Sequence, residues 1–330
     1  MTKILLTGGA GFIGSHILEN LVEDKKIKKI VVIDHLEDGS LKNIKNIISN
    51  KKVFFHKVNI KNYKKIEKLF KKIDVVIHLA AMSDIVPSII EPINYLHTNI
   101  LGTLNVLEAM RSNNVRKIIY SASSSCYGLT KSYPTDEKVK IDTRYPYAFS
   151  KFIGEYLLKH WSQVYKINYV SLRLFNVYGL RSRTHGAYGA AIGVFLKQKM
   201  SNVPLTIVGD GKQKRDFINV KDVAIAFNKS IFLKKKNVIL NIGSSKPIAV
   251  NYLASLISNR KIHIPKRPGE PDMTYANISK AKKILNWKPK ISIDDGISEL
   301  LKNISYWKNA PLWTKKKIRS ATKSWFKYLK

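Results

Sequence analysis

Two side chains with a chemically useful spacing are Tyr147 and Lys151, in the stretch YAFSK (147–151). They stand at positions i and i+4, so in a helix they would share one face. A lysine ammonium beside a phenol stabilises the phenolate and lowers the pKa of the phenol. A phenolate present near neutral pH can act as a general base toward a hydroxyl proton. The pair therefore predicts acid–base chemistry on an alcohol.

The chain contains a second Tyr-x-x-x-Lys match, from Tyr127 to Lys131. Gly128 follows this tyrosine directly and the stretch is typical of a loop, so no helix would align the two side chains. The first pair instead follows Pro146, a helix-start residue, and precedes apolar residues at helical spacing. A core tyrosine and an exposed lysine would be the simpler interpretation in a chain without a nucleotide-binding loop.

Such a loop is indicated by TGGAGFIGSH (7–16), which holds Gly8, Gly11 and Gly14 between an expected strand and an expected helix. The glycines permit a tight turn, close approach to a pyrophosphate and close helix–strand packing, and the helix N-terminus favours phosphate. Asp34 closes the next strand, 20 residues after Gly14, where a carboxylate binds a ribose diol and repels a 2′-phosphate. We therefore expect NAD rather than NADP.

These residues need a layered α/β framework to position them. Apolar strands alternate with helical patterns through the first half of the chain, which predicts an α/β fold with a Rossmann-type, doubly wound parallel sheet. We expect residues 1–180 to form the dinucleotide-binding domain and 181–330 a smaller α/β substrate-binding lobe interleaved with it. The stretch 310–330 is expected to be a helix on this lobe, without an assigned role. The expected strands span 3–8, 29–34, 52–60, 74–81, 116–123 and 168–179, and the expected helices 13–24, 62–72, 99–112 and 145–165.

The composition bounds the class of protein. With 330 residues, 45% of them hydrophobic, the chain can bury a large core, and no apolar run is long enough to span a membrane. Cys126 is the single cysteine, so no internal disulfide can form, and a reducing cytoplasm fits. We interpret it as an inert small hydrophobe. No Cys/His cluster has zinc spacing, so we expect no metal.

The net charge raises a different possibility. Lys and Arg total 58 against 23 acidic residues, a formal charge of +35. No nucleic-acid-binding motif accompanies the charge, so we interpret it as solvated lysine on many faces and expect no nucleic-acid partner. Loose adhesion to anionic membranes, a polyanion-binding role and a non-catalytic NAD-binding role remain as alternatives.

The glycine loop, Asp34, HLAA (78–81), SASSSCYG (121–128) and YAFSK occur in the order and spacing of the extended short-chain dehydrogenase/reductase superfamily. More narrowly, the chain resembles the NAD-dependent nucleotide-sugar epimerase/dehydratase family, especially UDP-sugar 4-epimerases. The segments 172–179, 209–224 and 266–272 resemble that family's sugar-nucleotide-binding segments. The resemblance covers nearly the whole chain and is much less specific for the substrate than for the family.

The resemblance implies roles for particular residues. Ser123 matches the catalytic Ser/Thr beside Tyr147 and Lys151, and Lys151 would also bond the nicotinamide ribose. Asn59 departs from the family's usual Asp but keeps an acceptor oxygen. Arg215 and Arg267 would clamp the diphosphate, where guanidinium forks suit phosphate oxygens. The implied NAD-binding residues are Gly8, Gly11, Phe12, Ile13, Gly14, Asp34, Asn59, Ile60, Leu79, Ala80, Ala81, Asn99 and Lys151. The implied substrate-binding residues are Ser83, Ser124, Ser125, Asn176, Arg215, Arg267 and Asp272.

The implied reaction is epimerisation at C4 of a UDP-hexose (UDP-glucose, UDP-N-acetylglucosamine or UDP-glucuronate) through a transient 4-keto sugar. Relatives that eliminate water or decarboxylate carry acidic residues in the segment after the fifth strand. Here Ser123, Ser124 and Ser125 stand there, which favours epimerisation over a 4,6-dehydratase or a uronate decarboxylase. The choice of sugar would depend on pocket shape, mainly at 83–88, 125–130 and 176–195.

The resemblance also suggests a homodimer. Two subunits would pair through the helix that starts near Asn99 and the helix that carries Tyr147. Several apolar residues on these helices allow such pairing and would equally serve an internal core: Leu101, Leu104, Leu107, Leu157 and Leu158.

Overall fold

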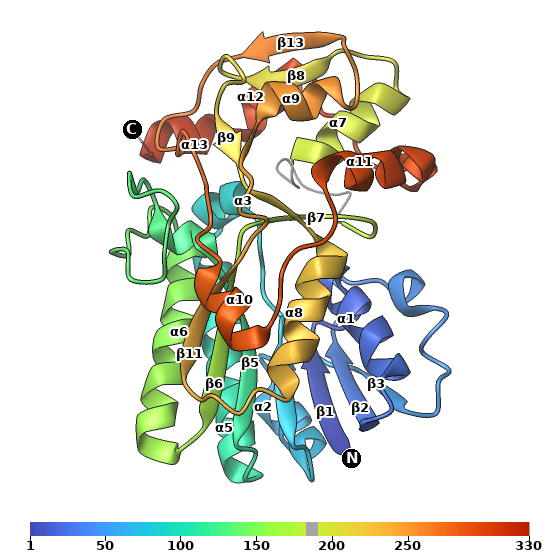
Figure 1. The fold of residues 1–330 in the computed structure, drawn as a ribbon, viewed down its shortest axis with the longest axis vertical. Coiled ribbons are helices and arrows are strands. Elements are labelled where there is room, and N and C mark those ends of the chain that lie inside the picture. Colours follow the sequence, from blue (N-terminus) through green and yellow to red (C-terminus); the bar gives the residue numbers. More distant parts are fainter. Residues whose placement is uncertain (183–190, 330) are drawn as a thin grey trace.

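The structure is a computed structural model that describes residues 1–182 and 191–329. Within these residues seven strands form one parallel sheet in the order β11-β6-β5-β4-β1-β2-β3 (Figure 1). β1 pairs with β2 on one side and with β4 on the other, so the strand order reverses at β1. This arrangement confirms the prediction of a doubly wound parallel sheet. The strands are β1 Thr2–Thr7, β2 Ile27–Asp34, β3 Val53–Lys57, β4 Val75–His78, β5 Lys117–Ser123, β6 Asn168–Leu174 and β11 Val238–Ile242.

Helices cover both faces of the sheet because its strands are apolar on both faces. In β1, Ile4 and Leu6 pack into one core cluster, whereas Leu5 between them packs into the other. The first cluster includes residues of α1 (Phe12–Glu23), α8 (Val220–Ile231) and α10 (Ser279–Leu285). The second includes residues of α2 (Tyr63–Ile66), α5 (Gly102–Ser112) and α6 (Pro146–Tyr165). Each fully buried aliphatic side chain stabilises this packing by about 1.5–3 kcal/mol.

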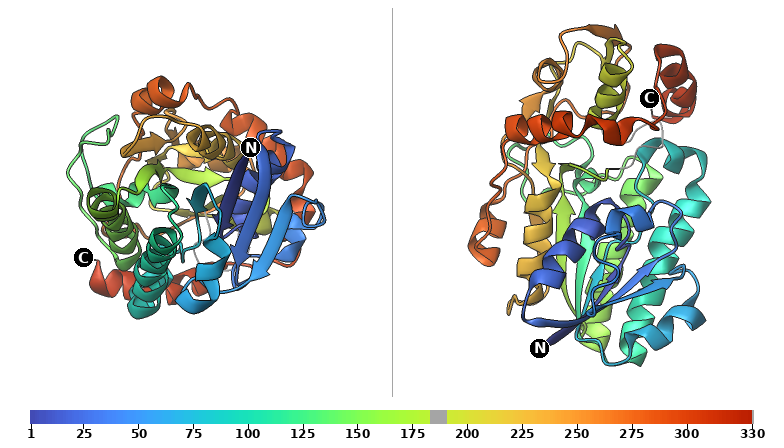
Figure 2. Two further views of the ribbon diagram at one scale, coloured as in Figure 1. Left: turned by 90° about the horizontal axis from the view of Figure 1, so that it is seen from below. Right: turned by 90° about the vertical axis from the view of Figure 1, so that its right-hand side faces the viewer.

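A smaller lobe lies beyond the carboxyl ends of the strands (Figures 1 and 2). Its separate core includes Leu205, Leu253, Leu300 and Trp307. The small sheets of the molecule pair β13 with β8, β10 with β7 and β12 with β9. The elements are β7 Asn176–Tyr178, α7 Ala191–Met200, β8 Leu205–Val208, β9 Lys214–Arg215, β10 Phe217–Asn219, β12 Ile248–Ala249, α9 Val250–Ser255, β13 Lys261–Ile264 and α11 Ile293–Lys302.

Several expected elements differ in extent. The strand expected over 168–179 is divided, because the chain leaves the main sheet at Phe175 and β7 pairs with β10 instead. The helix expected over 62–72 is a single α-turn, α2, followed by a 3-10 turn over Glu67–Phe70. α5 is preceded by a π-turn over His97–Leu101. Helices α3 (Ile85–Ile90) and α4 (Pro92–Leu96) and strand β11 were not expected; Pro92 separates α3 from α4.

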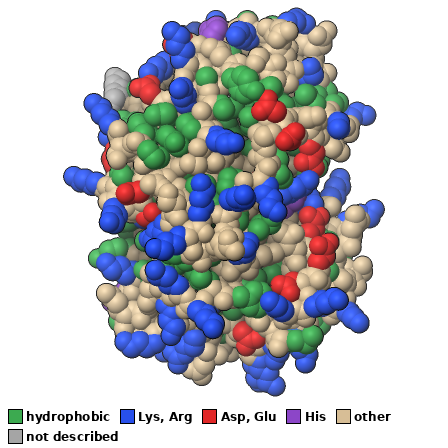
Figure 3. Space-filling view, in the orientation of Figure 1, with side chains coloured by type: hydrophobic (Ala, Val, Ile, Leu, Met, Phe, Trp, Pro, Cys, Tyr) green, Lys and Arg blue, Asp and Glu red, His purple; other side chains and the backbone are tan. Residues whose placement is uncertain are grey.

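The C-terminal stretch forms two short helices, α12 (Lys315–Ala321) and α13 (Lys323–Tyr328), instead of one helix. No helix among the described residues combines the length and the apolar character needed to cross a membrane. Lys and Arg side chains are scattered over both lobes on the face that Figure 3 shows, rather than gathered in one patch.

Candidate functional site

A cavity of about 600 Å³ lies between the carboxyl ends of the main strands and the smaller lobe. Residues that close or follow the strands line it, among them Gly8 after β1, Asp34 at the end of β2, Leu79 after β4 and Ser123 at the end of β5. Ligands of doubly wound sheets bind at this edge, beside the point where the strand order reverses. The cavity therefore lies where the fold itself favours a binding site.

The glycine loop closes one end of this cavity. Gly8 has a φ of +71°, and a Cβ there would lie 2.8 Å from the backbone nitrogen of Ala80. A Cβ on Gly14 would lie 2.1 Å from the Gly8 carbonyl oxygen, so the loop packs against the start of α1 more tightly than any larger residue permits. No side chain caps α1 at Gly11, which leaves its first N–H groups available to a phosphate. The predicted loop residues Gly8, Gly11, Phe12, Ile13 and Gly14 all line the cavity.

Asp34 is a buried carboxylate at the end of β2. One oxygen accepts from the Ala10 N–H and the other from the Leu36 N–H, each at 2.9 Å. A Cβ on Gly39 would come within 2.8 Å of the carboxylate, so the next loop approaches it closely. The carboxylate also lines the cavity. A glycine cradle beside a fixed carboxylate suits a dinucleotide with an unphosphorylated ribose.

The other residues expected to hold the cofactor divide into two groups. Asn99 does not line the cavity. Its buried amide accepts from the Met82 N–H at 2.8 Å and donates to the Met82 carbonyl and to Ser150 Oγ. Asn99 thus ties the loop after β4 to α6, and its contact with NAD stays a prediction. The residues that do line the cavity are Asn59, Ile60, Leu79, Ala80, Ala81 and Lys151.

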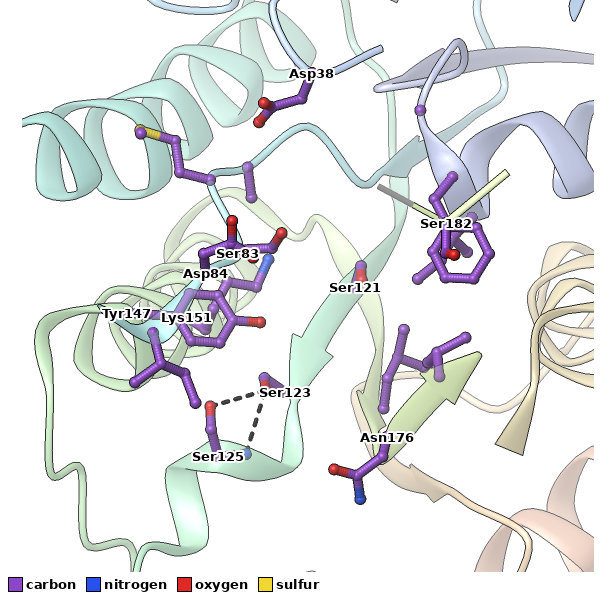
Figure 4. A pocket seen from close by; sticks show the side chains of 18 of the residues that line it. Asp38, Ser83, Asp84, Ser121, Ser123, Ser125, Tyr147, Lys151, Asn176 and Ser182 are labelled. Atoms are coloured by element: carbon purple, nitrogen blue, oxygen red, sulfur yellow. Dashed lines mark hydrogen bonds between the residues drawn. The ribbon is translucent and has the colours of Figure 1, made fainter. Parts of the chain in front are cut away.

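Tyr147, Lys151 and Ser123 meet at the centre of the cavity (Figure 4). α6 begins at Pro146, which places Tyr147 in its first turn and Lys151 one turn later. Ser123 closes β5 and lies beside the Tyr147 side chain in the cavity (Figure 4). Ser123 Oγ also lies 2.8 Å from Ser125 Oγ and accepts from the Ser125 N–H, which caps the 3-10 turn over Ser124–Tyr127. The serine-rich stretch is therefore both a turn and part of the cavity wall.

The pKa values of the pair differ from the sequence expectation. Burial raises the pKa of Tyr147, the nearby hydroxyl of Ser123 opposes this rise because it can donate to a phenolate, and the nearby charge of Asp84 raises the pKa further. Burial lowers the pKa of Lys151 to about 7, against the opposing charge of Glu155. Burial is the largest cause at both groups, so in the protein alone the pKa of Tyr147 lies above that of a free phenol and not below it, as had been expected from Lys151.

The second Tyr-x-x-x-Lys pair is structural. The Tyr127 hydroxyl donates to Asn241 Oδ1 at 2.7 Å and accepts from Arg173 Nη1 at 2.9 Å. Lys131 is exposed and lies in a loop, not in a helix. Neighbouring Cys126 is buried, and burial raises the pKa of its thiol to about 12, which agrees with its interpretation as inert.

Most residues expected to bind substrate line the cavity: Ser83, Ser124, Ser125, Asn176, Arg215 and Arg267. Asp272 does not; its side chain is 81% exposed and pairs with Lys266 at 2.7 Å, and its contact with substrate stays a prediction. The Asn176 amide donates to the Asp216 carbonyl and to Thr274 Oγ1. The segment 176–195, expected to influence the choice of sugar, includes 183–190, which lie outside the described residues.

The two arginines occupy the same end of the cavity. Arg267 pairs with Glu270 at 3.2 Å and its side chain is largely buried. Burial lowers the pKa of Arg215, Glu270 raises it, and the positive charge of nearby Arg267 lowers it. Two guanidinium groups close enough to repel one another are suited to an anion that would neutralise both.

Several cavity residues were not assigned individual roles from the sequence, among them Asp84, Tyr145, Ile318 and Trp325. Asp84 follows β4 and precedes α3, so its place after a parallel strand was the available signal. The segment SASSSCYG supplies hydroxyls and no carboxylate. Asp84 adds a buried carboxylate to the site from a different segment. Among the described residues no group of three His, Cys, Asp or Glu side chains could hold a metal ion.

The family model described as GDP-mannose 4,6 dehydratase matches residues 5–300. A putative UDP-glucose 4-epimerase of Methanocaldococcus jannaschii is 38% identical over 306 residues, which cover 90% of this chain and 97% of that protein.

The fold is shared with solved structures of other proteins, among them two 4-epimerases. The UDP-N-acetylglucosamine 4-epimerase of Methanobrevibacter ruminantium M1, in complex with UDP-N-acetylmuramic acid, has a TM-score of 0.86 at 32% identity and covers 93% of this chain and 98% of its own. The UDP-glucuronic acid 4-epimerase of Bacillus cereus, in complex with UDP-glucuronic acid and NAD, has a TM-score of 0.85 at 33% identity. The match covers 92% of this chain and 99% of that structure's chain. The present chain therefore belongs to the NAD-dependent family of nucleotide-sugar epimerases and dehydratases.

Proposed function

We propose that this chain is an NAD-dependent 4-epimerase of a UDP-hexose, with UDP-glucose, UDP-N-acetylglucosamine and UDP-glucuronate as the candidate substrates. The observation that carries the proposal is the meeting of Tyr147, Ser123 and Lys151 in the cavity that the glycine loop closes. Bound NAD would supply the hydride acceptor and return the hydride to the opposite face of the sugar.

Tyr147 would take the proton of the C4 hydroxyl as hydride leaves the same carbon, and would return it when the ketone is reduced. Ser123 would hydrogen-bond the reacting oxygen and hold the Tyr147 hydroxyl in place. Lys151 is near its pKa at neutral pH, so it can carry a charge when a phenolate forms beside it. The protein thus orients the sugar and moves one proton, and no net oxidation occurs.

The dinucleotide would lie along the glycine loop with its adenosine ribose at Asp34. The sugar diphosphate would lie across the cavity, at Arg215 and Arg267. This division supports residues 1–180 as the dinucleotide-binding part and 181–330 as the substrate lobe, interleaved where α8 and β11 return to the main sheet. Cytoplasmic location is part of the same proposal, because the substrate and the cofactor are intracellular nucleotides.

Dehydratases of the family must also remove a C5 proton and expel the C6 hydroxyl, which needs an acid and a base beyond Tyr147. The segment after β5 offers Ser123, Ser124 and Ser125 for these roles and no carboxylate. Asp84 reaches the cavity from the other side of Tyr147 and raises its pKa. Asp34 and Glu270 also line the cavity, but backbone N–H groups hold Asp34 and Arg267 pairs with Glu270. Epimerisation therefore remains the simpler outcome, with 4,6-dehydration and uronate decarboxylation as the second candidates.

The test is incubation with UDP-glucose, UDP-N-acetylglucosamine and UDP-glucuronate, alongside GDP-, CDP- and dTDP-sugars, followed by proton NMR. We expect new anomeric signals of the 4-epimer from at least one UDP-sugar, without loss of mass. A 4-keto-6-deoxy product would instead establish dehydration, and release of carbon dioxide would establish decarboxylation. Ser123→Ala should slow the reaction and leave NAD bound.

We also propose that two chains pair through the outer faces of α4, α5 and α6. Leu107 and Leu158 lie in the core, at 0% and 1% exposure, so they are not available to a partner. Large apolar residues nearby are exposed instead: Ile90, Ile93, Leu101, Phe149 and Tyr156. Light scattering at micromolar concentration should give twice the chain mass for the wild type, and Ile93→Arg should give a monomer. A monomeric wild type would overturn this part of the proposal.

A further inference from the structure

The C-terminal segment 311–329 contributes to the cavity although it lies beyond the part of the chain that the family model matches. That match ends at residue 300, whereas Ile318 and Trp325 line the cavity. The segment leaves the smaller lobe where Gln198 Nε2 donates to the Trp313 carbonyl at 2.8 Å. It ends at α13, which packs against α3 of the dinucleotide-binding part (Figure 1). The segment therefore crosses from one lobe to the other beside the cavity.

Trp325 anchors the far end of this segment. Its side chain is 2% exposed, and its indole N–H donates to the Pro268 carbonyl at 2.6 Å. Its ring centre lies 6.1 Å from that of Tyr145, two residues before the catalytic Tyr147. Arg267 Cζ lies 5.8 Å from the centre of the Trp325 ring, within the range of a cation–π contact. One side chain thus contacts the base of α6 and the loop that carries Arg267.

The loop around Arg267 also approaches the segment through its backbone. Gly269 has a φ of +69°, and a Cβ there would lie 3.3 Å from the Leu329 carbonyl oxygen. A larger residue would be strained in this conformation and would press on the end of α13. The loop and the segment therefore fit each other at two places, Pro268 with Trp325 and Gly269 with Leu329.

Arg267 is held from two directions. Glu270 pairs with its guanidinium at 3.2 Å, and the Trp325 ring lies against it. Long flexible side chains lose rotational freedom when they bind an anion, and a guanidinium that is already fixed loses less. A ring that fixes Arg267 should therefore strengthen the binding of a diphosphate and have little effect on proton transfer at Tyr147.

We propose that Trp325 is a positioning residue for the nucleoside diphosphate, which holds Arg267 in the cavity, and that the segment 311–329 closes this end of the site. The inference rests on the proposed function for the identity of the ligand. It places part of the binding site in residues 311–329, beyond the region that the family model matches.

The test compares Trp325→Ala, Trp325→Phe and the wild type as full-length, NAD-loaded protein. UDP binding is measured by isothermal titration calorimetry, and KM and kcat are measured with the UDP-sugar that the wild type converts. We expect Trp325→Ala to weaken UDP binding and raise KM by about tenfold or more, with kcat within about twofold. Trp325→Phe keeps a ring against Arg267 and loses the bond to Pro268, so its loss should be smaller. Tyr328→Ala, which truncates a 61% exposed aromatic residue of α13, is the matched control and should behave as the wild type.

UDP affinity of Trp325→Ala equal to that of the wild type would overturn the inference, even if the wild type epimerises a UDP-sugar. A fall in kcat with unchanged KM would also overturn it. If Trp325→Ala does not fold, Trp325→Leu, which keeps an apolar side chain and removes the ring, decides: weaker UDP binding supports the inference and unchanged binding overturns it. A wild type that binds UDP more tightly than Trp325→Ala but converts no UDP-sugar would refute the proposed reaction and support the inference. A wild type that binds no UDP would refute both.

Discussion

The ammonium nitrogen of Lys151 lies 4.4 Å from the centre of the Tyr120 ring, so the lysine of the predicted catalytic pair is packed between α6 and β5. The Tyr120 hydroxyl also donates to the Lys151 carbonyl at 3.3 Å. Tyr120 therefore contacts the ammonium of Lys151 and fixes the turn of α6 that carries it. The burial that gives Lys151 a defined position also lowers its pKa to about 7.

This lowered pKa predicts how stability depends on pH in the protein freed of NAD. Between pH 7 and about 10, unfolded chains hold a proton on Lys151 that the folded protein has released, so stability rises with pH. Below pH 7 the folded protein bears the full cost of the buried ammonium. Lys151→Met removes the titrating group. The free energy of unfolding of this variant, relative to that of the wild type, should therefore be most favourable below pH 7. That relative stability should then fall with pH by up to about 1.4 kcal/mol per unit.

Urea denaturation at several pH values measures this difference. Lys159→Met removes an exposed lysine from the same helix and is the matched control. The same pH profile for both variants would contradict the assignment of the effect to Lys151.

Tyr147 and Tyr127 form a natural pair for separating catalysis from stability. Tyr147→Phe removes the hydroxyl that meets Ser123, so we expect turnover to fall by roughly 10²–10⁴-fold with UDP still bound. Tyr127→Phe leaves buried Asn241 Oδ1 and Arg173 Nη1 without this partner, which should cost about 1–3 kcal/mol of stability and little turnover per folded molecule. Steady-state kinetics and thermal denaturation of both variants test this. A large loss of turnover in Tyr127→Phe and a small loss in Tyr147→Phe would instead assign the chemistry to Tyr127.

The part of the chain that builds the main sheet could be predicted from local pattern. Its strands are continuous apolar runs, the glycine loop lies between a strand and a helix, and Tyr147 and Lys151 are related by the period of one helix. Each of these signals spans fewer than about 30 residues, the scale on which sequence periodicity is informative. Asn99 shows the limit even here, because its burial beneath the loop depends on Met82 and Ser150.

The smaller lobe could not be predicted in the same way because long-range contacts form it. Trp325 reaches the cavity through a hydrogen bond to a residue 57 positions earlier, and no local spacing encodes that contact. β11 joins the main sheet only after the chain has built β8 in the smaller lobe. Asp272 lies next to the loop of Arg267 in sequence, yet its side chain faces solvent.

Asp34 should determine the choice between NAD and NADP. Asp34→Asn keeps the size of the side chain and removes the negative charge that repels a 2′-phosphate, so the preference for NAD should fall by about tenfold or more. An amide oxygen can replace only one of the two acceptors that Ala10 and Leu36 now use, so some stability should be lost as well. Dinucleotide titrations measure the preference, and an unchanged ratio of the two affinities would show that Asp34 supports the loop without contacting the ribose.

Gly154 should be as important to the catalytic helix as the residues that face the substrate. A Cβ at this position would lie 2.1 Å from the Tyr120 hydroxyl oxygen and 2.7 Å from Tyr120 Cζ. Gly154→Ala should therefore push α6 away from β5, destabilise the protein by about 1–3 kcal/mol and lower turnover by displacing Tyr147 and Lys151. Tyr120→Phe removes the atom nearest to the added methyl group. This substitution should therefore lower the free energy of unfolding less in the Gly154→Ala protein than in the wild type. A double-mutant cycle in urea measures this coupling; additive effects would mean that α6 accommodates the methyl group without moving.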